Sequence, residues 1–162
     1  MQPLTEQSIR ASFVNASIRE RKELSIPSLA TLDWENLDYL GWHDTKFVQL
    51  GYVVVELDGG PTGILMRQAD AHTRSRPQCS WCEDITLPND VVFFSVRRTG
   101  PAGRKGDTVG TLVCSNFECP SNVRKAPPVA YLGFDVEAAR QQRILALGEH
   151  VRAFVQDIRD GN

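Results

Sequence analysis

Four cysteines are the residues of this chain whose type and spacing best fit a chemical role. They form two pairs, Cys79 with Cys82 and Cys114 with Cys119, and the chain contains no other cysteine. Four thiolates can surround one Zn²⁺ tetrahedrally, each about 2.3 Å from the metal. The short C-x2-C loop can curl around such an ion, and the wider C-x4-C pair fits the start of a helix, where residues about four apart lie close together. The spacing therefore predicts one zinc site in which a hairpin-sized insert links a knuckle to a helix, the layout of a treble clef.

Two other uses of cysteine pairs compete with zinc. Disulfides need an oxidising compartment, and the first residues, 1–6, show neither the basic start nor the apolar run of a secretory signal. A redox C-x-x-C motif should begin a helix after a strand, whereas Pro77 precedes the first pair and Pro88 follows it closely. We therefore expect a cytoplasmic protein with a structural zinc, since a catalytic zinc keeps an open position and four thiolates close the shell.

Enzymatic chemistry has little support in the sequence. It contains no phosphate loop, no dinucleotide fingerprint and no Gly-x-Ser-x-Gly motif, and no pair of carboxylates stands out as an acid/base site. The three histidines, His43, His72 and His150, are expected at the surface or capping backbone groups, because four cysteines already fill a zinc shell. We expect a protein that is not an enzyme.

Length and composition predict one domain, or one domain with a helical appendage. Apolar residues make up 41% of the 162 residues, which is enough for a core, and no apolar stretch of about 18 residues indicates a membrane span. The formal net charge is −2, yet residues 67–125 hold nine Lys or Arg against six Asp or Glu. This small basic excess beside the cysteines is either a binding face or an ordinary solvated surface.

Hydrophobic periodicity and turn residues predict an α+β fold of antiparallel hairpins with a treble-clef zinc finger, flanked by N- and C-terminal helices. The predicted elements are a helix over 5–17, a turn at 41–44, strands over 50–57 and 63–68, a hairpin of strands 91–98 and 108–113 joined by a Gly-rich loop, and a helix over 135–159. Three segments follow: an N-terminal helical segment over 1–32, a hairpin and zinc-finger core over 33–125, and a Pro-rich joint with the C-terminal helix over 126–162.

The C-terminal helix carries the clearest apolar stripe of the chain. Its members recur at three- and four-residue steps: Ile144, Leu147, Val151, Phe154 or Val155, and Ile158. Such a stripe usually packs on its own domain, and Gly148 with Glu149 interrupts a clean heptad. We expect the helix to fold back onto its own chain and the protein to be a monomer.

Several motifs in a fixed order resemble one known family. They are residues 38–42, the strand over 52–57, the first cysteine pair, residues 92–98, residues 103–107 and residues 113–119. In this order they resemble the C-terminal treble-clef zinc-finger domain of the FusB-type proteins that bind elongation factor G, also called the FBP family. The resemblance covers roughly residues 33 to 125, and the short, actinobacterial-type members of the family look most similar.

The resemblance implies a function and part of a binding surface. FusB-type proteins bind elongation factor G through the zinc domain and promote its release from the ribosome. Their contact face includes the residue before the first cysteine, here Gln78, and a Lys-Gly-Asp segment, here Lys105 to Asp107, followed by Thr108. Gln78 and Thr108 stand where the family has aromatic residues.

Basic residues beside the motifs extend the expected partner surface to Arg97, Arg98 and Arg104. An alternative reading is a finger that binds ribosomal RNA or another nucleic acid, with Arg97, Arg98, Arg104 and Lys105 joined on the phosphates by Arg124 and Lys125. Phosphate binding should weaken steeply with salt, whereas a protein interface with a buried core should depend on salt less. A redox-sensitive zinc switch, which needs accessible thiolates of low pKa, is a third and weaker possibility.

Overall fold

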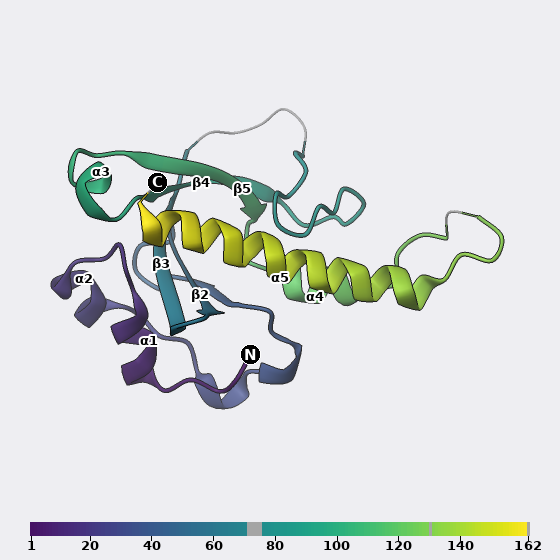
Figure 1. The fold of residues 1–162 in the computed structure, drawn as a ribbon, viewed down its shortest axis with the longest axis horizontal. Coiled ribbons are helices and arrows are strands. Elements are labelled where there is room, and N and C mark those ends of the chain that lie inside the picture. The colour runs from purple at the N-terminus through teal and green to yellow at the C-terminus, as the bar shows by residue number, and fades with distance from the viewer. Residues whose placement is uncertain (71–75, 130, 162) are drawn as a thin grey trace.

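A computed structural model describes residues 1–70, 76–129 and 131–161 (Figure 1). The helices and strands in chain order are α1 (Glu6–Ser12), α2 (Ile18–Glu23), the 3-10 turns η1 (Leu29–Thr31) and η2 (Trp34–Asn36), β1 (Leu40–His43), β2 (Leu50–Leu57), β3 (Gly60–Gln68), β4 (Val91–Arg97), α3 (Gly100–Arg104), β5 (Thr108–Cys114), α4 (Cys119–Arg124) and α5 (Val136–Asp160). The fold is α+β, with helices at both ends and the hairpins in one sheet, as predicted.

The five strands form one antiparallel sheet in the order β1-β2-β3-β4-β5. Each strand therefore lies beside its neighbour in the sequence. The hairpin of β4 and β5 pairs Val91 with Cys114 at one end and Arg97 with Thr108 at the other, so it connects the two cysteine pairs. This confirms the predicted hairpin-sized insert.

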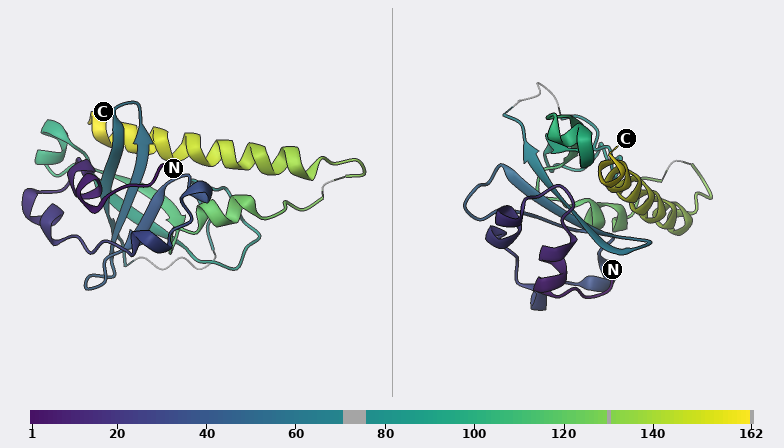
Figure 2. Two further views of the ribbon diagram at one scale, coloured as in Figure 1. Left: turned by 90° about the horizontal axis from the view of Figure 1, so that it is seen from below. Right: turned by 60° about the vertical axis from the view of Figure 1, so that its left-hand side comes forward.

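The sheet is covered on both faces because side chains of a strand alternate between them. In β3, Ile64 and Met66 enter a large core with α5 and the cysteines. Leu65, between them, faces a second core formed with the N-terminal segment. Figures 1 and 2 show the N-terminal segment and α5 on opposite sides of β2 and β3. The N-terminal segment and α5 thus cover opposite faces of the sheet.

The N-terminal segment differs from the single helix predicted over 5–17. It forms two short helices, each opened by a capping box: Thr5 accepts from the N–H of Ser8 at 3.1 Å, and Ser17 accepts from the N–H of Glu20 at 3.2 Å. Between the helices Phe13 is extended and forms an isolated bridge to Gly63 of β3, after which the chain bends over residues 14–16. Pairing with the sheet and a second cap at Ser17 outweigh the helical periodicity here.

Two predicted loops are also ordered elements. Residues 41–44, predicted as a turn, contribute three residues to β1, where Trp42 pairs with Tyr52 in the sheet. The Gly-rich loop after β4 contains α3, whose Gly103 lies so close to the carbonyl of Arg98 that a side chain there would overlap it. In both segments packing against neighbouring strands determines the structure. Such packing cannot be read from the turn propensity of the local sequence.

The C-terminal helix forms as predicted and packs on its own chain. Asp135 caps it, because its carboxylate accepts from the N–H of Ala138 at 2.9 Å. The residues of α5 that are fully buried in the core are Leu147, Val151, Val155 and Ile158. At its end, the N–H of Thr99 donates to the carbonyl of Ile158 at 3.2 Å. No helix in the described ranges combines the length and apolarity needed to cross a membrane.

Replacing Gly41 with alanine is expected to destabilise the protein by about 1–3 kcal/mol, because it overpacks the contact between β1 and the C-x4-C loop. A Cβ on Gly41 would lie 2.6 Å from the Cβ of Phe117 and 2.9 Å from the ring of Tyr39. Gly59 is the matched control, since a Cβ there meets nothing within 4 Å. Urea unfolding of both variants measures the difference. Equal free energies of unfolding for the two would show that the loop does not pack on β1.

Candidate metal centre and binding surface

Secondary structure brings the two cysteine pairs together. Cys79 and Cys82 lie in a turn before β4, Cys114 is the last residue of β5 and Cys119 is the first residue of α4. In the first turn the N–H of Cys82 points at Cys79 Sγ, 3.5 Å away. The C-x4-C loop is closed by Phe117, whose φ of 60° is left-handed. Of the second pair, predicted at a helix start, Cys119 begins α4 and Cys114 ends the preceding strand.

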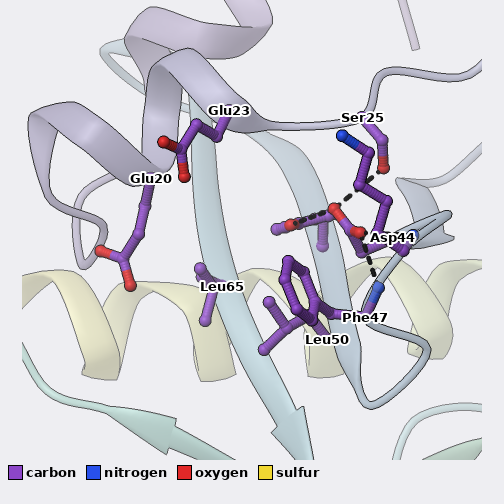
Figure 3. A pocket seen from close by; sticks show the side chains of 9 residues that line it. Glu20, Glu23, Ser25, Asp44, Phe47, Leu50 and Leu65 are labelled. Carbon is purple, nitrogen blue, oxygen red and sulfur yellow. Dashed lines mark hydrogen bonds between the residues drawn. The ribbon is translucent and has the colours of Figure 1, made fainter.

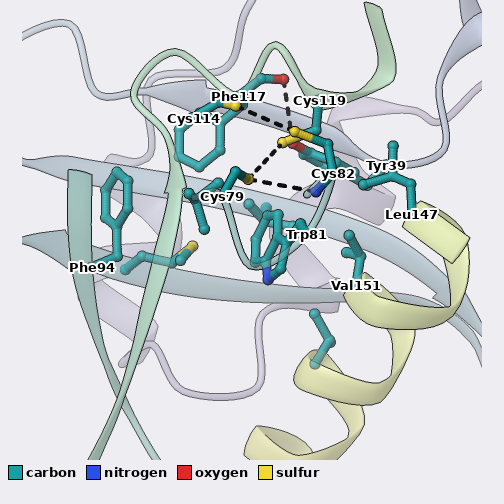
Figure 4. Packing of buried hydrophobic residues seen from close by; sticks show 14 of the residues in the cluster. Tyr39, Cys79, Trp81, Cys82, Phe94, Cys114, Phe117, Cys119, Leu147 and Val151 are labelled. Carbon is teal, nitrogen blue, oxygen red and sulfur yellow. Dashed lines mark hydrogen bonds between the residues drawn. The ribbon is translucent and has the colours of Figure 1, made fainter. Parts of the chain in front are cut away.

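The four sulfurs have the geometry of a tetrahedral metal site (Figure 4). Cys79 Sγ lies 3.6 Å from Cys119 Sγ, Cys82 Sγ lies 3.6 Å from Cys114 Sγ, and all four lie within 4.8 Å of one another. Zinc–sulfur distances of about 2.3 Å place the sulfurs of a tetrahedron about 3.8 Å apart. A disulfide needs about 2.05 Å, and all four cysteines are free. The residues fit zinc, and the protein has one structural zinc site.

The buried aromatic residues Tyr39 and Trp81 and the partly buried Phe154 pack beside the metal centre. Tyr39 and Trp81 meet edge to face with ring centroids 5.3 Å apart, and Phe154 of α5 lies 5.8 Å from Trp81. Burial, followed by the nearby cysteines, raises the pKa of Tyr39 well above its usual value. The side-chain amide of Asn122 points at Cys114 Sγ, 3.4 Å away. A closed, buried four-sulfur shell can contribute folding energy but offers no open position for a substrate.

Two histidines contact backbone carbonyls near this centre. His43 joins the carbonyls of Val48 and Ser115 through its two ring nitrogens, and His150 Nδ1 lies 3.0 Å from the carbonyl of Trp81. Both contacts fit the capping role expected from the sequence. His72 lies outside the described residues.

The expected partner residues fall at two ends of the β4–β5 hairpin. Gln78 is exposed beside the knuckle, where its side-chain amide donates to the carbonyl of Glu83 at 3.1 Å. The remaining six lie at the α3 end, where Arg97 pairs with Thr108. Six residue steps along β5, at about 3.3 Å each, separate Thr108 from Cys114 by about 20 Å. The structure therefore does not bring Gln78 together with the others.

The six residues at the α3 end also differ in whether their side chains are exposed or already paired within the chain. Exposed side chains belong to Arg97, Arg104, Lys105, Asp107 and Thr108. Arg98 instead pairs with Asp157 of α5 at 3.2 Å and thereby helps to hold the helix on the hairpin.

The basic set expected for nucleic acid is likewise divided. Arg124 pairs with Asp38 at 2.6 Å, and Lys125 Nζ donates to the side-chain carbonyl of Asn122 at 3.4 Å. Both residues belong to the α4 end of the molecule, away from α3. One residue near Arg97 was missed by the sequence analysis: Arg67 of β3, which pairs with Ser95 of β4. Arg67 lies near Arg97 because of the register between β3 and β4. No motif in the sequence around Arg67 indicates this position.

A hollow of about 380 Å³ lies between the N-terminal segment and the sheet (Figure 3). Its lining is partly apolar and partly acidic: Glu20, Glu23, Ser25, Asp44, Lys46, Phe47, Leu50, Tyr52 and Leu65. Burial alone would raise the pKa of Asp44. The backbone N–H groups of Phe47 and Lys46 and the hydroxyls of Tyr52 and Ser25 donate to its carboxylate and lower the pKa to about 2. At neutral pH Asp44 is therefore an anion, and its carboxylate joins backbone and side-chain donors across the β1–β2 turn.

Comparisons with known proteins agree with this geometry. The profile of the FBP C-terminal treble-clef zinc-finger family matches residues 8–158, a longer stretch than the resemblance expected over 33–125. The structure of the fusidic acid resistance protein FusC is similar with a TM-score of 0.56 and 18% identity. That match covers 75% of this chain and 53% of FusC, so the chain spans about half of that protein's length. No curated protein sequence matches significantly.

The family profile spans both cysteine pairs, the whole sheet and nearly all of α5. FusC adds a likeness of fold to the likeness of sequence. On these grounds the chain belongs to the FBP C-terminal treble-clef zinc-finger family.

Proposed function

We propose that this protein is a zinc-stabilised interaction module that binds elongation factor G and modulates its release from the ribosome, without being an enzyme. The observation that carries the proposal is the family match over residues 8–158, which includes the finger hairpin and its Lys-Gly-Asp segment. The fold of FusC, a fusidic acid resistance protein, supports it. A partner in translation implies action in the cytoplasm.

The Lys-Gly-Asp segment is held in a form suited to recognition. The N–H of Lys105 donates to the carbonyl of Ala102 at 3.0 Å, and the carbonyl of Asp107 accepts from the N–H of Arg98 at 3.1 Å. Gly106 between them adopts a φ of 95°, which a residue with a side chain rarely adopts. The Lys105 side chain is exposed and projects from an anchored backbone, so little ordering is needed on binding.

Anchoring of α3 also links this surface to the zinc centre. The hydroxyl of Thr99 donates to the carbonyl of Arg159 at 2.6 Å, and Arg98 pairs with Asp157. The same helix, α5, packs on Trp81 of the knuckle through Phe154. Zinc would therefore support binding indirectly, by fixing the helix and hairpin that present Lys105.

Reversing the charge of Lys105 tests the proposal. We expect Lys105→Glu to weaken binding to purified elongation factor G about tenfold or more, because a charged contact in an interface is replaced by repulsion. Lys46→Glu, a reversal of an exposed lysine in the β1–β2 loop, is the control and should bind like the unaltered protein. Isothermal titration calorimetry measures both, with zinc content and melting temperature expected to stay unchanged.

Two results would contradict the proposal. In one, the unaltered protein shows no heat of binding to elongation factor G. In the other, a ribosomal RNA fragment binds in its place with an affinity that falls steeply as salt rises, by a log–log slope of about −0.9 for each duplex phosphate contact. If the Lys105→Glu variant binds elongation factor G as tightly as the unaltered protein, the binding surface does not include the α3 end of the hairpin.

A further inference from the structure

Near the α3 end of the β4–β5 hairpin one face is open, whereas toward the other end Val91, Leu112 and Cys114 pack with the main core. The N-terminal core extends over β1, β2 and β3, and in the described part of the chain no residue of β4 or β5 joins it. The residues of this open face are Phe93, Ser95, Arg97, Thr108 and Gly110. Phe93 is 40% exposed, and its ring lies against Gly110, where any side chain would overlap it. The open face thus presents one exposed aromatic ring beside polar residues.

A groove runs where the N-terminal layer ends and the open face begins. Asn15 forms the step: its side-chain amide donates to the carbonyls of Leu65 at 2.9 Å and Arg97 at 3.0 Å, and its side-chain oxygen accepts from the N–H of Leu65 at 2.8 Å. The groove has a volume of about 160 Å³. Its lining comes from three strands and the N-terminal segment: Asn15, Glu20, Leu65, Arg67, Ser95, Arg97 and Thr108.

The two arginines of this groove form no ion pair at contact distance with a described carboxylate, although Glu20 is near enough for their charges to act on it. Seven other arginines form ion pairs within the chain: Arg10, Arg19, Arg98, Arg124, Arg140, Arg143 and Arg159. Arg67 and Arg97 are exposed and form none. Two free guanidinium groups in one groove, with the hydroxyl residues Ser95 and Thr108 beside them, match an anion that accepts several hydrogen bonds.

Glu20 borders the groove but does not neutralise it. Its carboxylate accepts from the N–H of Ser17 at 2.7 Å and so completes the cap of α2. Hydrogen bonds from Ser17 lower the pKa of Glu20, and the charges of Arg97 and Arg67 lower it further. Glu20 also borders the acidic hollow of Figure 3. One negative charge against two guanidinium groups leaves the groove one positive charge, which a single carboxylate balances, whereas a phosphate backbone carries a charge on every nucleotide.

We propose that the groove between Arg67 and Arg97 receives an Asp or Glu side chain of the partner protein, with an adjacent apolar side chain resting on Phe93. The volume supports a side chain over a nucleotide, since small-molecule sites usually enclose about 300–1,000 Å³. Because Arg97 pairs with Thr108, the groove lies at the same end of the hairpin as Lys105. The inference rests on the proposed function for its partner and adds the chemistry by which that partner is recognised.

Charge reversal measures the contribution of the groove to binding elongation factor G. Arg67→Glu and Arg97→Glu are each expected to weaken binding about 10- to 100-fold, the range for a lost charge-assisted contact. Arg152→Glu is the control, since Arg152 is exposed on α5 and also forms no ion pair with a described residue. It should bind within about twofold of the unaltered protein. Melting temperature and zinc content should not change in any of the three.

A peptide titration tests the groove without elongation factor G. The pentapeptide acetyl-Gly-Asp-Leu-Gly-Gly-amide, added at millimolar concentration to the zinc-loaded protein, should shift the amide NMR signals of Ser95 and Thr108. The same peptide with Asn in place of Asp should not, and Arg67→Glu should remove the effect.

The two experiments separate the groove from the proposed function. Unchanged signals together with normal elongation factor G binding by both arginine variants would overturn the groove and leave the function standing. NMR shifts that only the Asp peptide causes, in a protein that does not bind elongation factor G, would support the carboxylate-binding groove. They would contradict elongation factor G as the partner. Displacement of the peptide by an oligouridylate would overturn the protein occupant in favour of RNA.

Discussion

Replacing Cys119 with serine is expected to abolish zinc binding and to unfold the finger. Structural zinc contributes an apparent free energy of about 10–16 kcal/mol in zinc-finger peptides, which is as large as the whole stability of a typical domain, about 5–15 kcal/mol. All four cysteines lie in the main core with Trp81 and four residues of α5. Loss of the metal should therefore also release α5 and change the tryptophan fluorescence.

Ser80→Ala is the matched control for Cys119→Ser. Ser80 lies in the same knuckle with an exposed side chain, and its backbone N–H donates to the carbonyl of Leu112 at 2.7 Å, a bond that alanine keeps. This variant should hold one zinc per chain and melt like the unaltered protein. Elemental analysis and circular dichroism measure both. A Cys119→Ser protein that keeps a full equivalent of zinc and its melting temperature would contradict the four-sulfur site.

Leu147→Ala is expected to destabilise the protein by about 2–5 kcal/mol, the cost of a cavity in a packed core. Leu147 is fully buried under α5. Leu145 is the same residue type two positions earlier on the same helix, and it is 67% exposed. Leu145→Ala should change the free energy of unfolding by no more than about 0.5 kcal/mol. Chemical denaturation of both variants gives the comparison.

The same pair of variants distinguishes cis packing from assembly. If α5 served a second chain instead of its own sheet, the effect of Leu147→Ala would grow as protein concentration falls. A loss of unfolding free energy that is the same at every protein concentration supports the monomeric state that we propose. Equal effects of the two substitutions would contradict the burial of this face of α5.

Features that depend on residue type and short spacing were predictable from the sequence. Four cysteines at two short spacings identify the metal and its ligands, because few other arrangements satisfy four thiolates. The apolar stripe of the last helix contains Leu147, Val151 and Ile158, which the structure buries. Periodicity alone leaves one step of the stripe open between Phe154 and Val155, and in the structure Val155 is the fully buried one, whereas Phe154 is partly buried.

Features that depend on contacts between distant segments were not predictable. The helix predicted over 5–17 breaks where Phe13 meets Gly63, fifty residues later in the chain. The segment 41–44 reads as a turn until β2 offers it a pairing partner. Arg67 gains its place beside Arg97 only through the register of β3 and β4. None of these contacts leaves a local pattern in a single sequence, because each is set by tertiary packing.

Native mass spectrometry of the zinc-loaded protein mixed with purified elongation factor G tests the central claim most directly, because one spectrum reports metal, chain number and complex. The predicted spectrum contains one chain with one zinc, and a complex of one such chain with one elongation factor G. Removal of zinc with a chelator should remove the complex as well. A metal-free chain with intact disulfides, or a zinc-loaded chain that never forms the complex, would contradict the account.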